Sequence, residues 1–213
     1  MVGSPNVPNL ITIGRILACP AIFFLALAPS IGARMVAFAL FVAAGLSDLW
    51  DGYLARKHGW ITDVGKILDP LADKLLLLST FIPFYIISHR EGGEWLIPLW
   101  GMLPMWVMIV ILGREFLVTL FRQWAVRREV VIAAGASGKY KAFMQNLFSG
   151  GLLLWYPLQE AASAWGFGGF AYRVWVHFHS TFIGLTLGFA LILTIYSMID
   201  YIWSYRALMG VKD

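Results

Sequence analysis

Aspartates are concentrated in one short stretch of the sequence. Five of the 12 acidic residues fall between positions 48 and 73, and all five are aspartate. Four of them form two pairs, because Asp48 and Asp51 are three residues apart while Asp69 and Asp73 are four apart. With about 3.6 residues per helical turn, the members of each pair share one face of a helix. Asp63 lies between the pairs, where we expect a solvated acid or a helix cap.

Four carboxylates in one pocket repel one another strongly where the dielectric constant is low. Such a cluster either stays protonated or binds cations. Short carboxylate ligands suit hard divalent ions such as Mg²⁺, Mn²⁺ or Ca²⁺. Two divalent ions would balance the four charges, and pairs of metal ions recur in phosphoryl-transfer sites. We therefore expect two divalent ions, Mg²⁺ or Mn²⁺, bound by Asp48, Asp51, Asp69 and Asp73.

The composition places this cluster in a membrane protein. The chain has 213 residues, of which 60% are hydrophobic and 13% are charged, and this charged fraction is about half that of a soluble domain. A soluble enzyme, a disordered protein and a nucleic-acid-binding protein are all disfavoured, so we expect no nucleic-acid partner. We predict one all-α membrane domain, residues 1–213, with six transmembrane helices. The six spans are expected at Asn9–Ala28, Ala33–Ala55, Lys66–Ser88, Trp95–Val126, Phe143–Trp165 and Val176–Trp203.

The basic residues predict the orientation of these spans. With the N-terminus inside, the outer loops hold only Arg34, Arg90 and Arg173, and the other 13 of 16 basic residues lie toward the cytoplasm. This asymmetry favours a cytoplasmic N-terminus and a cytoplasmic C-terminus. It also places both aspartate pairs at the inner ends of two antiparallel neighbouring spans. Because no cleavable leader precedes the first span, we expect a bacterial plasma-membrane protein with its active site on the cytoplasmic side.

The aspartates belong to a longer pattern of residues. It reads Asp48-x2-Asp51-Gly52-x2-Ala55-Arg56-x8-Gly65-x3-Asp69-x3-Asp73, and it resembles the signature of the CDP-alcohol phosphotransferases. The resemblance implies a six-helix membrane enzyme that moves a phosphatidyl or similar group from a CDP-linked donor to an alcohol and releases CMP. It implies that the four aspartates hold the two metal ions and that Asp73 is the base for the acceptor hydroxyl. It also implies that the CDP site is lined by Asp51, Gly52, Ala55, Arg56 and Gly65.

Further segments resemble one branch of that family, the phosphatidylglycerophosphate synthases. The segment Asn6–Arg15 resembles the N-terminal start of the branch, and Gly113–Phe116 followed by Arg122 resembles its fourth-helix motif. Gly138–Lys141, followed by Gln145, resembles the element that opens its fifth helix. This resemblance implies CDP-diacylglycerol as donor, sn-glycerol 3-phosphate as acceptor, and phosphatidylglycerophosphate and CMP as products. Membrane lipids and a second copy of the chain, in a homodimer, are the further partners that it implies.

A phosphate-bearing acceptor also needs cations close to the metal ions. Arg114 and Arg122 are eight residues apart, which is about 80° around one helix and about 12 Å along it. Lys139 and Lys141 begin the next span on the same side of the membrane. We expect these four cations to bind the acceptor phosphate. The alternatives are an ion pair between Arg114 and Glu115, a contact with lipid phosphate, and, for Lys139, the general enrichment of basic residues in cytoplasmic loops.

Other functions remain as alternatives. The same chemistry could use inositol phosphate or phosphatidylglycerol as the acceptor. An acidic cluster inside a helical bundle could also form the pathway of a cation or proton transporter. Such a pathway needs polar residues at successive depths, but here the acids gather at one end, and Arg15 and Asp200 are among the few charges in the first, fifth and sixth spans. A purely structural membrane protein would leave four convergent carboxylates without a purpose.

Overall fold

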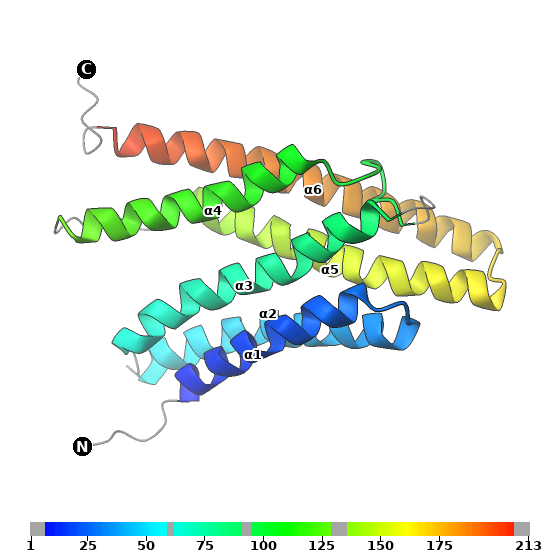
Figure 1. Cartoon of the computed structure of the whole chain (residues 1–213), viewed down its shortest axis with the longest axis horizontal. Helices are drawn as coiled ribbons and strands as arrows, with labels where there is room; N and C mark the ends of the chain where they lie inside the picture. Colours follow the sequence, from blue (N-terminus) through cyan, green and yellow to red (C-terminus); the bar gives the residue numbers. More distant parts are fainter. Residues whose placement is uncertain (1–6, 59–61, 91–94, 129–135, 207–213) are drawn as a thin grey trace.

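The computed structural model describes residues 7–58, 62–90, 95–128 and 136–206. Six α-helices account for most of these residues, which confirms the predicted all-α fold. They run roughly along one direction, and the first helix begins at the same end of the bundle at which the last helix ends (Figure 1). The helices are α1 Val7–Leu27, α2 Ile31–His58, α3 Asp63–Ser88, α4 Met105–Val126, α5 Ala136–Trp165 and α6 Phe170–Ser204.

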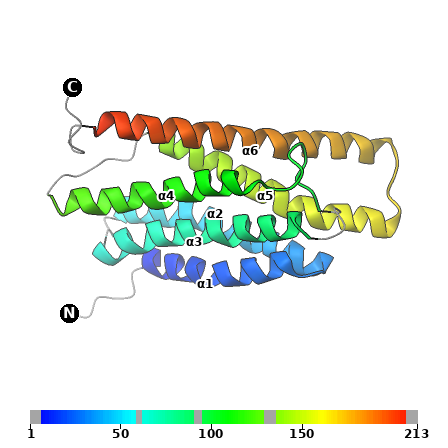
Figure 2. The same ribbon diagram turned by 45° about the horizontal axis from the view of Figure 1, so that its top comes forward.

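The helices form two groups that share an interface. α1 packs against α2 and α3, while α5 packs against α6 and α2. α4 lies against α6 and, to a smaller extent, against α3 (Figures 1 and 2). The short connection between α2 and α3 brings the end of one helix beside the start of the next. We call this end of the bundle, where α2 ends at His58 and α3 begins at Asp63, the aspartate end.

Four of the described helices are long and apolar enough to cross a membrane. The qualifying stretches are Val7–Leu27 in α1, Ile31–Gly52 in α2, Ile67–Ser88 in α3 and Phe170–Ser204 in α6. These stretches indicate an integral membrane protein. α4 carries three charged residues within its length and α5 begins with a basic segment, and neither helix is among these four. The arrangement as six membrane spans stays a prediction.

The fourth helix begins later than hydropathy predicts. The expected span Trp95–Val126 is helical only from Met105, and residues 95–104 form a turn instead. The backbone N–H of Ile97 donates to the carbonyl of Gly101 at 2.8 Å, and the N–H of Gly101 donates back at 2.9 Å. Hydropathy could not reveal this turn, because its residues are as apolar as those of a spanning helix.

The fifth and sixth helices begin earlier than predicted. α5 starts at Ala136 rather than at Phe143, and α6 starts at Phe170 rather than at Val176. These first turns carry polar and basic residues, which a search for apolar runs leaves out. As a result, Lys139 lies within α5 instead of in the preceding loop.

The turn before α4 packs against α6 at Gly184. The indole N–H of Trp100 donates to the carbonyl oxygen of Gly184 at 3.0 Å. Leu99 has a φ of 67°, in the left-handed region that is unfavourable for a branched side chain. Its side chain lies directly over Gly184, where an added Cβ would be 2.8 Å from the Cβ of Leu99. Gly184 therefore allows the turn to approach the helix closely.

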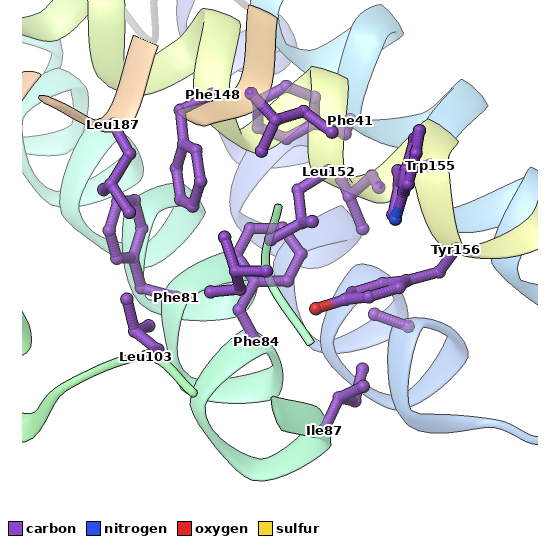
Figure 3. Packing of buried hydrophobic residues seen from close by; sticks show 14 of the residues in the cluster. Phe41, Phe81, Phe84, Ile87, Leu103, Phe148, Leu152, Trp155, Tyr156 and Leu187 are labelled. Carbon is purple, nitrogen blue, oxygen red and sulfur yellow. The ribbon is translucent and has the colours of Figure 1, made fainter. Parts of the chain in front are cut away.

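An aromatic cluster fills the centre of the bundle between α3 and α5. Phe81 and Phe84 of α3 are fully buried against Phe148 of α5, with ring centroids 5.4 and 5.8 Å from that ring. Tilted and edge-to-face rings at such distances are favourable arrangements. Leu103 and Leu187 close one side of the cluster (Figure 3). This packing holds α3 and α5 at the spacing that the polar residues farther along both helices require.

We predict that Gly184→Ala destabilises the protein, whereas Gly188→Ala does not. A Cβ at position 184 must displace Leu99, while the nearest atom to a Cβ at position 188 is Cζ2 of Trp100 at an ordinary 3.8 Å. Overpacking of this kind costs about 1–3 kcal/mol. Thermal unfolding in detergent, followed by tryptophan fluorescence, should show a lower melting temperature for Gly184→Ala alone. Equal melting temperatures for the two variants would contradict the close contact.

Candidate active site

Arg15 of α1 joins the two aspartate pairs. Its guanidinium forms ion pairs with Asp48 and Asp51 of α2, and its Nη1 lies 3.1 Å from Oδ1 of Asp73 on α3. The arginine side chain is fully buried, at 0% exposure. Three of the four predicted metal ligands therefore meet around one cation, so the aspartates converge as their spacing predicts. Among the described residues, however, α2 and α3 are joined mainly through α1, which packs against both, rather than by facing each other directly.

Thr12, one turn before Arg15, extends these contacts to the remaining aspartate. Its Oγ1 lies 2.9 Å from Oδ1 of Asp69 and 3.4 Å from Oδ2 of Asp51. The single hydroxyl proton can be donated to only one acceptor at a time. One face of α1 thus touches all four aspartates. From the sequence, Thr12 and Arg15 belong to the segment that resembles the N-terminal start of the synthases, but nothing there assigns them to the aspartate cluster. The available signal, a threonine and an arginine three residues apart in an apolar helix, does not identify their partners.

The aspartates differ in their access to solvent. The side chain of Asp51 is buried at 5% exposure, whereas those of Asp48 and Asp73 are 44% and 63% exposed. Asp48 and Asp73 line a cavity of about 1010 Å³ at the aspartate end. A ligand in this cavity can therefore reach Asp73 directly, while Asp51 stays among the buried ion pairs.

A second wall of the cavity, which we call the basic wall, is formed by α4 and α5. It contributes the four cations expected to bind an acceptor phosphate: Arg114, Arg122, Lys139 and Lys141. α6 also lines the cavity and adds Asp200 to it. The structure thus brings these cations and two of the aspartates to the same cavity, although the two sets lie far apart in the sequence. Phosphate groups are recognised by such combinations of guanidinium and ammonium groups.

Glu115 lies within this basic wall and engages two of its cations. The buried ammonium of Lys141 forms an ion pair with Glu115, and Nη1 of Arg114 lies 3.5 Å from the same carboxylate oxygen. The pairing of Arg114 with Glu115 was one of the alternatives left open by the sequence. Among the described residues, the Nε atoms of Arg114 and Arg122 are buried without a hydrogen-bond partner. Arg122 lines the cavity, so an anionic ligand there can reach its guanidinium group.

Two glycines of the predicted CDP site have different surroundings. Gly65 is buried at the start of α3, and its N–H donates to Oγ1 of the capping Thr62 at 3.0 Å. A Cβ at Gly65 would lie 2.9 Å from Oδ1 of Asn9, so this glycine allows α1 and α3 to approach. Gly52 is half-buried on α2, and neither glycine is among the described residues that line the cavity. Three side chains lie outside the described part of the structure: Ala55, Arg56 and Asp63.

The donor atoms of the cluster fit a hard divalent cation, because all of them are carboxylate oxygens. Within the described residues, no three acidic, histidine or cysteine side chains are gathered into a ready-made metal site. The reason is that Arg15 stands between the aspartates. Each of Asp48, Asp51 and Asp73 contacts Arg15 through one oxygen, so the second oxygen of each carboxylate remains for another ligand.

The sequence is similar to those of known proteins over most of its length. Residues 5–196 match the family described as CDP-alcohol phosphatidyltransferase. Relatives named CDP-diacylglycerol–glycerol-3-phosphate 3-phosphatidyltransferase include one from Rickettsia bellii, 38% identical over 66% of this chain and 70% of the relative. Those from Bacillus subtilis and Haemophilus influenzae are 35% and 30% identical, over 70% and 92% of this chain and over 77% and 91% of the respective relatives.

The match includes both aspartate pairs, the segment between them and the basic residues of α4 and α5. Members of the matched family generally depend on divalent metal ions. The chain belongs to the CDP-alcohol phosphatidyltransferase family.

Proposed function

We propose that this protein transfers a phosphatidyl group from CDP-diacylglycerol to sn-glycerol 3-phosphate, giving phosphatidylglycerophosphate and CMP. The observation that carries the proposal is the cavity at the aspartate end, where Asp48 and Asp73 face four cations from α4 and α5. The donor carries a pyrophosphate, which metal ions on the aspartates can bind. The acceptor carries a separate phosphate, which the cations of α4 and α5 can bind. The names of the relatives from three bacterial genera support this choice of substrates.

The aspartates form the donor side of the site. We propose that Asp48, Asp51, Asp69 and Asp73 hold two divalent cations, Mg²⁺ or Mn²⁺. When bound, such ions supply positive charge that stabilises the pyrophosphate and the departing phosphate of CMP. The family pattern further assigns the cytidine diphosphate to Asp51, Gly52, Ala55, Arg56 and Gly65.

Asp73 is the proposed base. The acceptor hydroxyl oxygen forms a bond to the phosphatidyl phosphorus, the bond from that phosphorus to the CMP oxygen breaks, and the hydroxyl proton passes to Asp73. A carboxylate is a weak base for an alcohol, but it can accept the proton while the new bond forms. The 63% exposure of Asp73 toward the cavity supports this role, since the base must touch the acceptor.

The basic wall forms the acceptor side. We propose that Arg114, Arg122, Lys139 and Lys141 bind the phosphate of the acceptor. Glu115 holds the buried ammonium of Lys141 inside the cavity and lowers the net charge of this wall. A phosphate-bearing acceptor suits such a wall better than an uncharged alcohol does.

We further propose that the enzyme works as a homodimer in a bacterial plasma membrane, with the cavity open to the cytoplasm. The distribution of basic residues supports this orientation, because the basic wall lies at the aspartate end, where α1 begins and α6 ends (Figure 1). CDP-lipid headgroups and small phosphorylated alcohols meet at that surface. The lipid chains of donor and product would remain in the bilayer.

Purified protein should release CMP from CDP-diacylglycerol only when a divalent cation and sn-glycerol 3-phosphate are both present. Labelled glycerol 3-phosphate should appear in a lipid product of matching amount. Parallel reactions with inositol phosphate and with phosphatidylglycerol test the alternative acceptors. If CMP release is independent of glycerol 3-phosphate, or is faster with another acceptor, glycerol 3-phosphate is not the acceptor. Cation flux into vesicles without a CDP-lipid would instead support a transporter.

Asp73→Asn should lower the turnover number by about 100- to 10,000-fold, the usual contribution of a positioned general base. The amide has the same shape but cannot accept the proton. Glu160→Gln is the matched control, because it makes the same chemical change at the opposite end of the bundle, where Glu160 pairs with Arg34. CMP release and thermal unfolding should be measured for both variants. Near-normal turnover of Asp73→Asn would remove Asp73 as the base.

Arg122→Met should raise the KM for glycerol 3-phosphate roughly tenfold or more, since a hydrogen bond to a charged group contributes about 1.5–3 kcal/mol. The KM for CDP-diacylglycerol should change little. Arg128→Met is the control, because Arg128 is exposed at the end of the same helix and stacks on Trp124 at 4.1 Å. Steady-state kinetics with each substrate varied in turn gives both constants. A rise in the KM of the donor alone would place the acceptor phosphate elsewhere.

A further inference from the structure

Arg15 is the only charged residue of α1, and it lies in one of the most apolar helices of the protein. A charge in such a position costs a few kcal/mol unless partners compensate it. Here the partners are Asp48, Asp51 and Asp73, all of which belong to the proposed metal-binding set. We infer that Arg15 is a built-in counter-ion of the aspartate cluster, which competes with divalent cations and thereby sets the cation concentration that the site requires. The inference rests on the proposed function, because it concerns the same cation site.

The charge balance supports competition. The four carboxylates and the guanidinium together carry a net charge of about −3, so two divalent cations would leave the cluster with about +1. The guanidinium cannot relieve this excess by losing a proton, because it stays charged in proteins. Every divalent cation that binds the aspartates therefore does so against the repulsion of Arg15.

The packing limits the movement of Arg15. Its side chain is fully buried between α1, α2 and α3, although Arg15 borders the same cavity as Asp48 and Asp73. It engages one oxygen of each of three carboxylates, and those oxygens are also candidate ligands for a cation. An incoming cation must therefore share these carboxylates with Arg15 or weaken their contacts to it.

In the absence of divalent cations, Arg15 stabilises the folded protein. It compensates Asp51, which is buried at 5% exposure and would otherwise be a buried carboxylate with little compensation. Removing one partner of a buried ion pair destabilises a protein strongly. A single coupling between Arg15 and the divalent cation should therefore show itself twice, in the cation affinity and in the cation dependence of the melting temperature.

The test uses Mn²⁺ alone, with the full chain purified in detergent and free Mn²⁺ followed by electron paramagnetic resonance. Arg15→Met should bind Mn²⁺ about tenfold more tightly than the wild type, or tighter still. In EDTA its melting temperature should be lower than that of the wild type, and saturating Mn²⁺ should close most of that difference. Arg15→Gln, which keeps a neutral side chain with amide N–H donors, should shift both measurements in the same direction and serves where Arg15→Met does not fold.

Arg34→Met is the matched control. Arg34 is also a buried arginine in an ion pair, with its Nη1 2.9 Å from Oε2 of Glu160, and it stacks over Trp95 at 4.4 Å at the other end of the bundle. Its replacement should lower the melting temperature equally with and without Mn²⁺. The dissociation constant for Mn²⁺ should stay unchanged, because the substitution leaves the aspartate cluster intact.

The possible outcomes separate the two proposals. If the wild type binds no Mn²⁺, the proposed divalent-cation site is wrong, whatever Arg15 does. If the wild type binds Mn²⁺ and both neutral variants bind it equally or more weakly, the counter-ion role of Arg15 is overturned while the cation site stands. Arg15→Lys keeps the charge and should bind Mn²⁺ much as the wild type does. If Arg15→Lys raises the affinity for Mn²⁺ as much as Arg15→Met does, the inference is also overturned, because the charge of residue 15 would then not be the cause.

Discussion

A buried charge must be compensated inside an apolar bundle, and in this protein that constraint is met by the ion pairs between Arg15 and the aspartates of α2 and α3. These contacts, with those of Thr12, tie three helices together at one end. Because each helix provides a group that another helix requires, the register of α1, α2 and α3 is determined by polar contacts. Farther from the aspartate end, apolar and aromatic packing takes over, as between Phe81 and Phe148 (Figure 3).

The cavity has walls of opposite character because different parts of the bundle build them. The acidic wall belongs to α2 and α3 and is held by α1, whereas the basic wall belongs to α4 and α5. Two substrates that both carry phosphate groups would lie between these walls. The acidic wall can hold a phosphate only through bound cations, while the basic wall can hold one directly. Under the proposed function, this difference would assign each substrate to one side of the cavity.

The sequence predicts the acidic wall well, because aspartates spaced by three and four residues on apolar helices leave few other arrangements. It also predicts that Arg114 and Arg122 lie on one of the helices that form the basic wall. The role of Arg15 could not be predicted, since its partners are more than 30 residues away and only tertiary packing brings them together. The engagement of Lys141 by Glu115 depends in the same way on tertiary structure, because the two residues are 26 positions apart in the sequence. Hydropathy predicts a helix at residues 95–104, where the structure has a turn, because hydropathy measures polarity and not backbone geometry.

The position of α4 has a consequence for how acceptor preference can diverge among related proteins. α4 lies against α6 and only slightly against α3, so few neighbours limit changes on its surface. The acidic wall is different, because each of its aspartates is also a structural contact of α1. Under the proposed function, substitutions at Arg114, Glu115 or Arg122 would alter which alcohol is accepted while the aspartates keep their places. The bundle would in this way separate a structurally constrained donor half from a less constrained acceptor half.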